Sequence, residues 1–190
     1  MLATPAYQAQ SAFGARHLLQ VANAPALQPA SPARLGKARV VPIPPRVTRD
    51  GDVIGRLSIP SIKLEAPIVQ GTGAWALRDA VGHVVTSVLP SQSGTTVLAA
   101  HNNTFFHHLD QVRPGDVLLI RTASHLCQYR VYGIKRVFTG ASLAEPAFSG
   151  VVLETCYPLD ELTPTSWRYL VFAALVSASS DAAAPPIRPQ

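Results

Sequence analysis

Charged residues are scarce in this sequence: they make up 14% of it, against 47% hydrophobic residues. A chain this apolar can bury a large core, so it is not a disordered, highly charged polymer. Long regular helices are also excluded, because 17 prolines and 12 glycines are spread along 190 residues and proline breaks or kinks a helix. The longest strongly apolar run, Tyr169–Ser180, is about half the roughly 20 residues that a membrane-spanning helix needs.

Cysteine is equally rare. Cys127 and Cys156 could form at most one disulfide bond, which is too few for a disulfide-stabilised scaffold. Cys127 alternates with Tyr129 and Val131 on one face of a predicted strand, so we expect it in the core. The histidines lack metal-ligand spacing with the cysteines, and the carboxylates are dispersed along the chain. Neither a metal ion nor another cofactor is therefore expected.

The net charge of +5 does not indicate a nucleic-acid-binding protein. The excess lies in residues 1–50, which hold six basic residues and one acidic residue, and the remainder of the chain is balanced. A globular part without a clustered basic patch offers no binding surface for phosphates. No nucleic-acid partner is therefore expected.

The chain divides into an arm, a globular domain and a tail. Residues 1–50 contain seven prolines and little apolar periodicity, and we expect them to form a basic, Pro/Ala-rich arm or linker. Residues 51–178 consist of short β-rich segments separated by turn residues, a pattern typical of an all-β barrel or sandwich. Residues 179–190 are predicted to be a disordered tail. The predicted strands are Val53–Ile59, Ile62–Val69, Val84–Val88, Thr95–Ala100, Asp116–Arg121, Leu126–Phe138, Val151–Thr155 and Arg168–Val176.

Reactive side chains stand at three strand ends of the predicted domain. His101 follows one apolar strand, Cys156 ends another, and Arg168 opens the last strand. A cysteine nucleophile needs a cationic neighbour that favours its thiolate and an acid for the leaving group, and histidine can serve both roles. Taken singly, His101 could be a hydrogen-bonded histidine, Cys156 a small buried hydrophobe and Arg168 a solvated strand residue.

The order of these motifs resembles that of the sortases. An Ala-His is followed by Phe-Phe and Leu, a later strand ends in Thr-Cys-Tyr-Pro, and after a loop an arginine opens the final apolar strand. Residues 54–60, Ile-Gly-Arg-Leu-Ser-Ile-Pro, are similar to the family's opening strand, and Gly-His at 82–83 and Gly-Asp at 115–116 also match. The resemblance covers residues 51–178. The Cys-Tyr-Pro and the short gap to Arg168 are most similar to class D.

The resemblance implies a closed eight-stranded β-barrel with short helices, and a cysteine transpeptidase that cleaves a Leu-Pro-x-Thr-like sorting signal after threonine. On that basis Cys156 attacks the threonine carbonyl and forms a thioester. His101 protonates the leaving amine and later deprotonates the incoming one, while Arg168 helps to hold the substrate or its oxyanion. The expected partners are a surface-protein sorting signal and an amine acceptor of a peptidoglycan precursor or a pilin.

The predicted substrate-binding residues lie mostly in one loop. Leu143, Ala147 and Phe148 are expected to line an apolar groove, and Thr155 beside the nucleophile is also assigned to substrate binding.

Two features depart from the family pattern. Sortases commonly have an arginine after the catalytic histidine, where this chain has Asn102. Many sortases also carry an N-terminal membrane anchor, and this chain shows none. We expect the anchor to have been removed from an enzyme of the extracytoplasmic face of the bacterial membrane, soluble as given.

Other functions stay open at this point. Water could resolve the same thioester, which would make the protein a hydrolase, or the barrel could be an inactive binding module. A disulfide between Cys127 and Cys156 would abolish the nucleophile. Other cysteine enzymes fit less well: no histidine follows Cys127, contrary to the papain-like order, and L,D-transpeptidases have Ser-x-Gly-Cys where this chain has Leu-Glu-Thr-Cys.

Overall fold

The computed structural model describes residues 49–141, 148–161, 163 and 165–180. Most of the expected arm, Leu143, Ala147 and the last ten residues of the expected tail lie outside the described residues. In the described part of the chain, none of the helices has the length and apolar character needed to cross a membrane.

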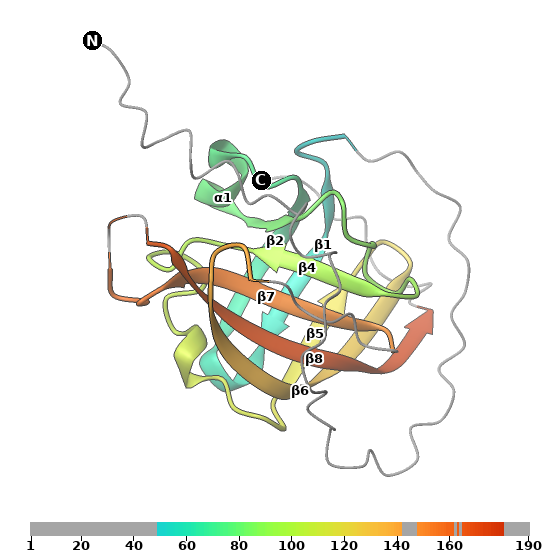
Figure 1. The fold of residues 1–190 in the computed structure, drawn as a ribbon. Coiled ribbons are helices and arrows are strands. Elements are labelled where there is room, and N and C mark those ends of the chain that lie inside the picture. The colour runs from blue at the N-terminus through green and yellow to red at the C-terminus, as the bar shows by residue number, and fades with distance from the viewer. Residues whose placement is uncertain (1–48, 142–147, 162, 164, 181–190) are drawn as a thin grey trace.

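Eight strands close into a β-barrel, which confirms the fold that the sortase resemblance implies (Figure 1). Around the barrel their order is β1-β2-β3-β4-β7-β8-β6-β5, and β5 pairs with β1. The described helices are short and lie in the connections. The elements are β1 (Val53–Ile59), η3 (Pro60–Ile62), β2 (Leu64–Gln70), α1 (Ala74–Asp79), β3 (Val81–His83), β4 (Thr95–Ala99), η4 (Leu109–Gln111), β5 (Val117–Arg121), β6 (His125–Phe138), β7 (Gly150–Tyr157) and β8 (Trp167–Ser180).

Alternating apolar residues fill the barrel interior. Leu57 and Ile59 of β1 and Leu118 and Ile120 of β5 have no exposed surface, because every second side chain of a strand points to the same face. Burying one such side chain stabilises the fold by about 1.5–3 kcal/mol. Cys127 is fully buried in the same core, as predicted, and both cysteines are free thiols.

The prediction of a strand at Val84–Val88 is wrong. The strand at this place in the chain, β3, ends at His83, and residues 84–88 form a turn. Ser87 donates its amide to the Val84 carbonyl at 2.9 Å and its hydroxyl to the same oxygen at 2.7 Å. This local pairing overrides the strand preference of the valines. In β3 itself, a Cβ on Gly82 would lie 2.5 Å from the Gly71 carbonyl oxygen, so glycine permits this close backbone approach.

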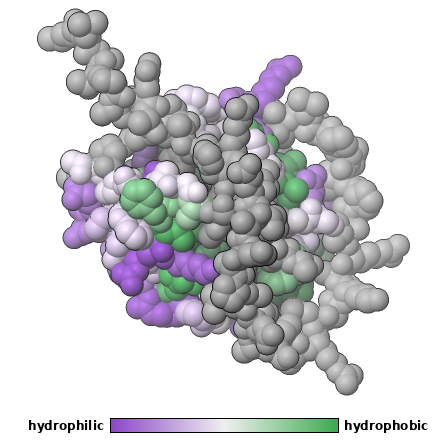
Figure 2. Space-filling view, in the orientation of Figure 1, coloured by the Kyte–Doolittle hydropathy of each residue, from purple (hydrophilic) through white to green (hydrophobic). Residues whose placement is uncertain are grey.

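The described surface mixes apolar and hydrophilic side chains, as the face in Figure 2 shows. Two exposed aromatic residues form a pair at the ends of β6 and β8: Phe138 lies edge-on to Trp167, with 5.6 Å between ring centroids. Trp167 directly precedes Arg168 in β8, so this aromatic pair lies on the face of the strand opposite to the Arg168 side chain.

Candidate active site

Strands β4, β7 and β8 bring the three predicted catalytic residues to one level of the barrel. β4 runs parallel to β7, with Ala99 opposite Glu154. His101 and Cys156 each follow that pair by two residues, so they stand at the same height where their strands end. β8 runs antiparallel to β7 and places Arg168 directly opposite Cys156. The strand register thus brings these three residues, which are far apart in the sequence, to the same end of the barrel.

The nucleophile candidate lies on the outer face of the barrel. Leu153 and Thr155 have no exposed surface and point inward, so Glu154 and Cys156 point outward. Arg168 shares this outer face because it pairs with Cys156. Cys156 keeps 8% exposure. A buried apolar cluster adjoins this face and consists of Val84, Val97, Val152 and Leu170.

Burial dominates the acidity of the Cys156 thiol. Loss of water raises its pKa, and the nearby Glu154 carboxylate raises it further. The Arg168 guanidinium and a backbone hydrogen bond with Thr165 act in the opposite direction and lower the pKa. The thiolate is therefore a minority form at neutral pH, and Arg168 is the charged group that favours it.

His101 is half-buried, and burial lowers its pKa from the ordinary value of 6.5. Most of the imidazole is therefore neutral at neutral pH. A neutral imidazole can accept a proton from an amine, whereas protonation of a leaving group requires the imidazolium. The form that carries both thiolate and imidazolium is a small fraction of the molecules.

Arg168 is held from two sides. Its Nε lies 3.5 Å from Oε1 of Glu154, and these side chains are only 16% and 13% exposed. Its Nη1 donates to the carbonyl oxygens of Thr165, at 2.7 Å, and Trp167, at 2.9 Å. In the sequence Glu154 is one of several dispersed carboxylates. Its spacing of two from Cys156, which places both on one strand face, is the signal that could have identified it.

Asn102 connects the segment after His101 to the segment after Cys156. Its buried side chain donates through Nδ2 to the carbonyl oxygens of Pro158, at 3.0 Å, and Glu161, at 2.6 Å. The sequence identifies Asn102 only as a departure from the arginine common in the family. In the structure it fixes the start of the loop between β7 and β8.

The predicted substrate-binding residues occupy different environments. The Thr155 hydroxyl points inward and donates to the Ala100 carbonyl at 2.8 Å, with no exposed surface. Phe148 is 38% exposed and packs edge-on against Tyr132, with 5.5 Å between ring centroids. The other two lie in the part of the loop that the structure does not describe.

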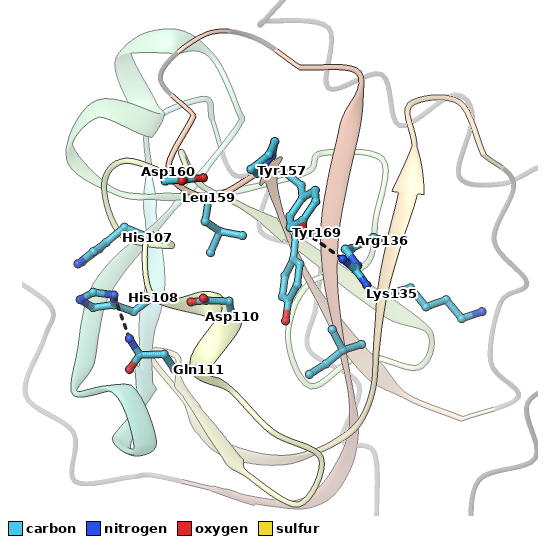
Figure 3. A pocket seen from close by; sticks show the side chains of 12 residues that line it. His107, His108, Asp110, Gln111, Lys135, Arg136, Tyr157, Leu159, Asp160 and Tyr169 are labelled. Carbon is cyan, nitrogen blue, oxygen red and sulfur yellow. Dashed lines mark hydrogen bonds between the residues drawn. The ribbon is translucent and has the colours of Figure 1, made fainter.

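A pocket of about 840 Å³ opens beside the site (Figure 3). Tyr157 and Tyr169 stack at 6.0 Å along one wall, and Arg136 donates to the Tyr157 hydroxyl at 3.1 Å. Tyr157 follows Cys156 directly and so points to the opposite face of β7. Cys156 does not line this pocket. The lining residues are His107, His108, Asp110, Gln111, Ile134, Lys135, Arg136, Tyr157, Pro158, Leu159, Asp160 and Tyr169.

Metal coordination has no support in the described residues, where no group of three or more His, Cys, Asp or Glu side chains is arranged to hold an ion. The chemistry available at the strand ends is that of a thiol, an imidazole and a guanidinium. This combination suits nucleophilic attack on a carbonyl and proton transfer to a nitrogen.

Residues 57–176 match the family model of the sortase domain. Sortase D of Bacillus subtilis (strain 168) is 31% identical over 130 residues, which are 67% of this chain and 66% of that protein. The match thus spans slightly less than two thirds of this curated relative. It agrees with the class D features around Cys156.

Solved structures give the same result. A lid mutant of sortase A from Corynebacterium diphtheriae is 30% identical, with a TM-score of 0.61 over 67% of this chain and 72% of that chain. Sortase C-1 from Actinomyces oris is 31% identical, with a TM-score of 0.59 over 66% of this chain and 75% of that chain.

Proposed function

Because the chain belongs to the sortase family, we propose that it is a cysteine transpeptidase whose catalytic residues are His101, Cys156 and Arg168. The observation that carries the proposal is the register of three adjacent strands, which places these residues at one level. The proposed catalytic unit is residues 51–178, which β8 extends to Ser180, with residues 1–50 as an arm and the residues after Ser180 as a tail.

In the first half-reaction the Cys156 thiolate attacks the threonine carbonyl carbon of a Leu-Pro-x-Thr-like signal. The electron pair of the carbonyl moves to oxygen, and Arg168 stabilises the oxyanion. When the intermediate collapses, the carbon–nitrogen bond breaks and the His101 imidazolium gives its proton to the leaving amine. The products are a thioester on Cys156 and the released C-terminal part of the signal.

In the second half-reaction an amine attacks the thioester carbonyl. The now neutral His101 accepts a proton from the incoming amine, and the sulfur leaves as the thiolate. The thiolate and the imidazolium are thereby restored, so the cycle consumes no cofactor. We place the reaction at the extracytoplasmic face of the cell membrane, with a peptidoglycan precursor or a pilin as the acceptor.

The sorting signal is proposed to lie on the outer face of β4 and β7. The buried apolar cluster next to Glu154 lies on that face. Leu143, Ala147 and Phe148 are proposed to contact the apolar part of the signal. Thr155 would contribute through its backbone position, because its hydroxyl donates to the Ala100 carbonyl in the interior.

Peptide processing tests the proposal. Leu-Pro-x-Thr and Leu-Ala-x-Thr peptides are incubated with the protein and an amine, either glycine-based or containing diaminopimelate, and the products are identified by mass spectrometry. We expect a peptide cleaved after threonine and joined to the amine. Cleavage without joining would instead indicate a hydrolase. No cleavage, together with a Cys156 that a thiol-reactive probe does not label, would indicate an inactive binding module.

Cysteine variants provide the matched controls. Cys156→Ala removes the proposed nucleophile and should abolish cleavage. Cys127→Ala makes the same chemical change in the barrel core, away from the outer face, and should retain it.

A further inference from the structure

Glu154 is an unexpected neighbour for a thiol nucleophile. Its side chain is 13% exposed, and its partners in the flanking strands, Ala99 and Leu170, are apolar. Placing a carboxylate in such surroundings is costly unless a cation compensates it. Its negative charge also disfavours the Cys156 thiolate. The proposed reaction assigns no step to this residue.

An ion pair joins Glu154 to Arg168, with 3.5 Å between Oε1 and Nε. The opposite edge of the guanidinium donates through Nη1 to the carbonyl oxygens of Thr165 and Trp167. Thr165 lies just before β8 and Trp167 is the first residue of β8, whereas Glu154 belongs to β7. The plane of the guanidinium is therefore fixed by contacts from two different strands.

We propose that Glu154 is a positioning residue, whose carboxylate holds the Nε edge of Arg168 across β7 and β8 and keeps the guanidinium beside the Cys156 sulfur. The role rests on the proposed function in so far as Arg168 assists the reaction. The contact itself does not depend on which substrate is used.

Two effects of Glu154 on the Cys156 thiol have opposite signs. As a nearby negative charge, it raises the pKa of the thiol. By holding Arg168 in place, it keeps the positive charge that lowers this pKa. Removing the carboxylate therefore makes the thiolate more abundant if Glu154 is only a nearby charge, and less abundant if it positions Arg168.

The test measures alkylation of Cys156 by iodoacetamide as a function of pH, in a Cys127→Ala background where it is the single thiol. With Arg168 present, we expect Glu154→Gln to slow alkylation at neutral pH severalfold, since the thiol pKa rises when Arg168 is no longer held in place. In an Arg168→Ala background the same change should give no slowing. An unchanged or faster rate with Arg168 present would overturn the proposal.

Glu154→Asp is a second variant, which keeps the test possible if Glu154→Gln does not fold. It keeps the negative charge but shortens the side chain by one methylene. The proposal predicts slower alkylation here too, and an unchanged rate would contradict it. The control is Glu65→Gln, which removes a carboxylate from an exposed pair with Arg56 at 3.8 Å and should change nothing. Thermal melts confirm that each variant is folded.

Turnover of a sorting-signal peptide separates this proposal from the proposed function. Glu154→Gln should lower kcat severalfold and leave KM within about twofold, and in the Arg168→Ala background it should have no further effect. Equal losses of kcat in both backgrounds would count against a role through Arg168. If the unmodified protein processes no peptide, the proposed function fails, while alkylation still decides the role of Glu154.

Discussion

Arg168 provides the positive charge that opposes the electrostatic cost of a buried Cys156 thiolate. Its planar group can also offer several donors at fixed angles, whereas a lysine offers a compact point charge. Fixed donors directed at an oxyanion are commonly worth about 3 kcal/mol of activation free energy, or roughly a hundredfold in rate. We therefore propose two roles for Arg168, which are to favour the thiolate and to stabilise the oxyanion.

Arg168→Lys should reduce kcat by about a hundredfold, because the charge remains but the planar fork is lost. Steady-state kinetics with a sorting-signal peptide measure this loss, and circular dichroism shows whether the barrel remains folded. Wild-type turnover in the variant would remove Arg168 from the mechanism.

The pH dependence of kcat/KM should be bell-shaped with widely separated limbs. The imidazolium of His101 is lost as the pH rises through a pKa below its ordinary 6.5. The Cys156 thiolate forms as the pH rises through a pKa above its ordinary 9.0. The form with both charges is therefore most abundant between the two values. Rates measured from pH 4 to 11 test this, and an acid limb above 6.5 or an alkaline limb below 9.0 would contradict it.

His101, Cys156 and Arg168 could be predicted from the sequence because each stands in a recognisable local motif at a strand end. Asn102 could not, since its role depends on groups elsewhere in the chain, and Glu154 shows only its spacing of two from Cys156. The acceptors of the Asn102 side chain are 56 and 59 residues away. No periodicity within one segment identifies such partners.

At the level of elements, two loops meet beside the nucleophile. The segment after β4 and the segment after β7 are joined by the Asn102 side chain, which donates to two carbonyl oxygens. The position of the loop between β7 and β8 therefore depends on a residue next to His101.

Asn102→Ala should lower the free energy of unfolding by about 1–3 kcal/mol, because two hydrogen bonds made by a buried side chain are lost. It should also lower turnover, since the loop that begins at Pro158 is released. Urea unfolding and peptide kinetics measure the two effects. Asn103→Ala is the matched control, because the neighbouring Asn103 is exposed; equal effects of both changes would argue against this tether.

Thr155 connects β7 to β4 from the inside of the barrel, through its bond to the Ala100 carbonyl. Thr155→Val keeps the side-chain shape but leaves that carbonyl without this donor, so the free energy of unfolding should fall by about 1–3 kcal/mol. Thr155→Ser retains the hydroxyl and should lose less. If chemical denaturation shows that Thr155→Val is more stable than Thr155→Ser, the hydroxyl does not stabilise this strand pair.

Strand periodicity predicted seven of the barrel strands near their observed positions, but it misplaced the third. The valines of Val84–Val88 favour a strand by propensity, whereas the Ser87 hydrogen bonds to Val84 fix a turn. Strand order and the parallel pairing of β4 with β7 are long-range features. Local pattern does not reveal them, and the sortase resemblance implied only a closed eight-stranded barrel.

At the scale of the whole molecule, the order of the strands in the barrel positions the site. β7 lies between β4 and β8 in the closed order, so Cys156 is flanked by the strand that leads to His101 and by the strand that carries Arg168. A nucleophile on an edge strand would have only one such neighbour. The barrel therefore supplies the three groups from a rigid sheet, and the loops are left to contact the substrate.

The most direct test of this account is to trap the acyl-enzyme. The protein is mixed with a Leu-Pro-x-Thr peptide, quenched in acid, digested and mapped by mass spectrometry. We expect the N-terminal part of the peptide, ending in threonine, to be joined through a thioester to Cys156, and this adduct to be lost when an amine is added before quenching. A peptide that is cleaved while Cys156 stays unmodified, or a thioester found on Cys127 instead, would contradict it.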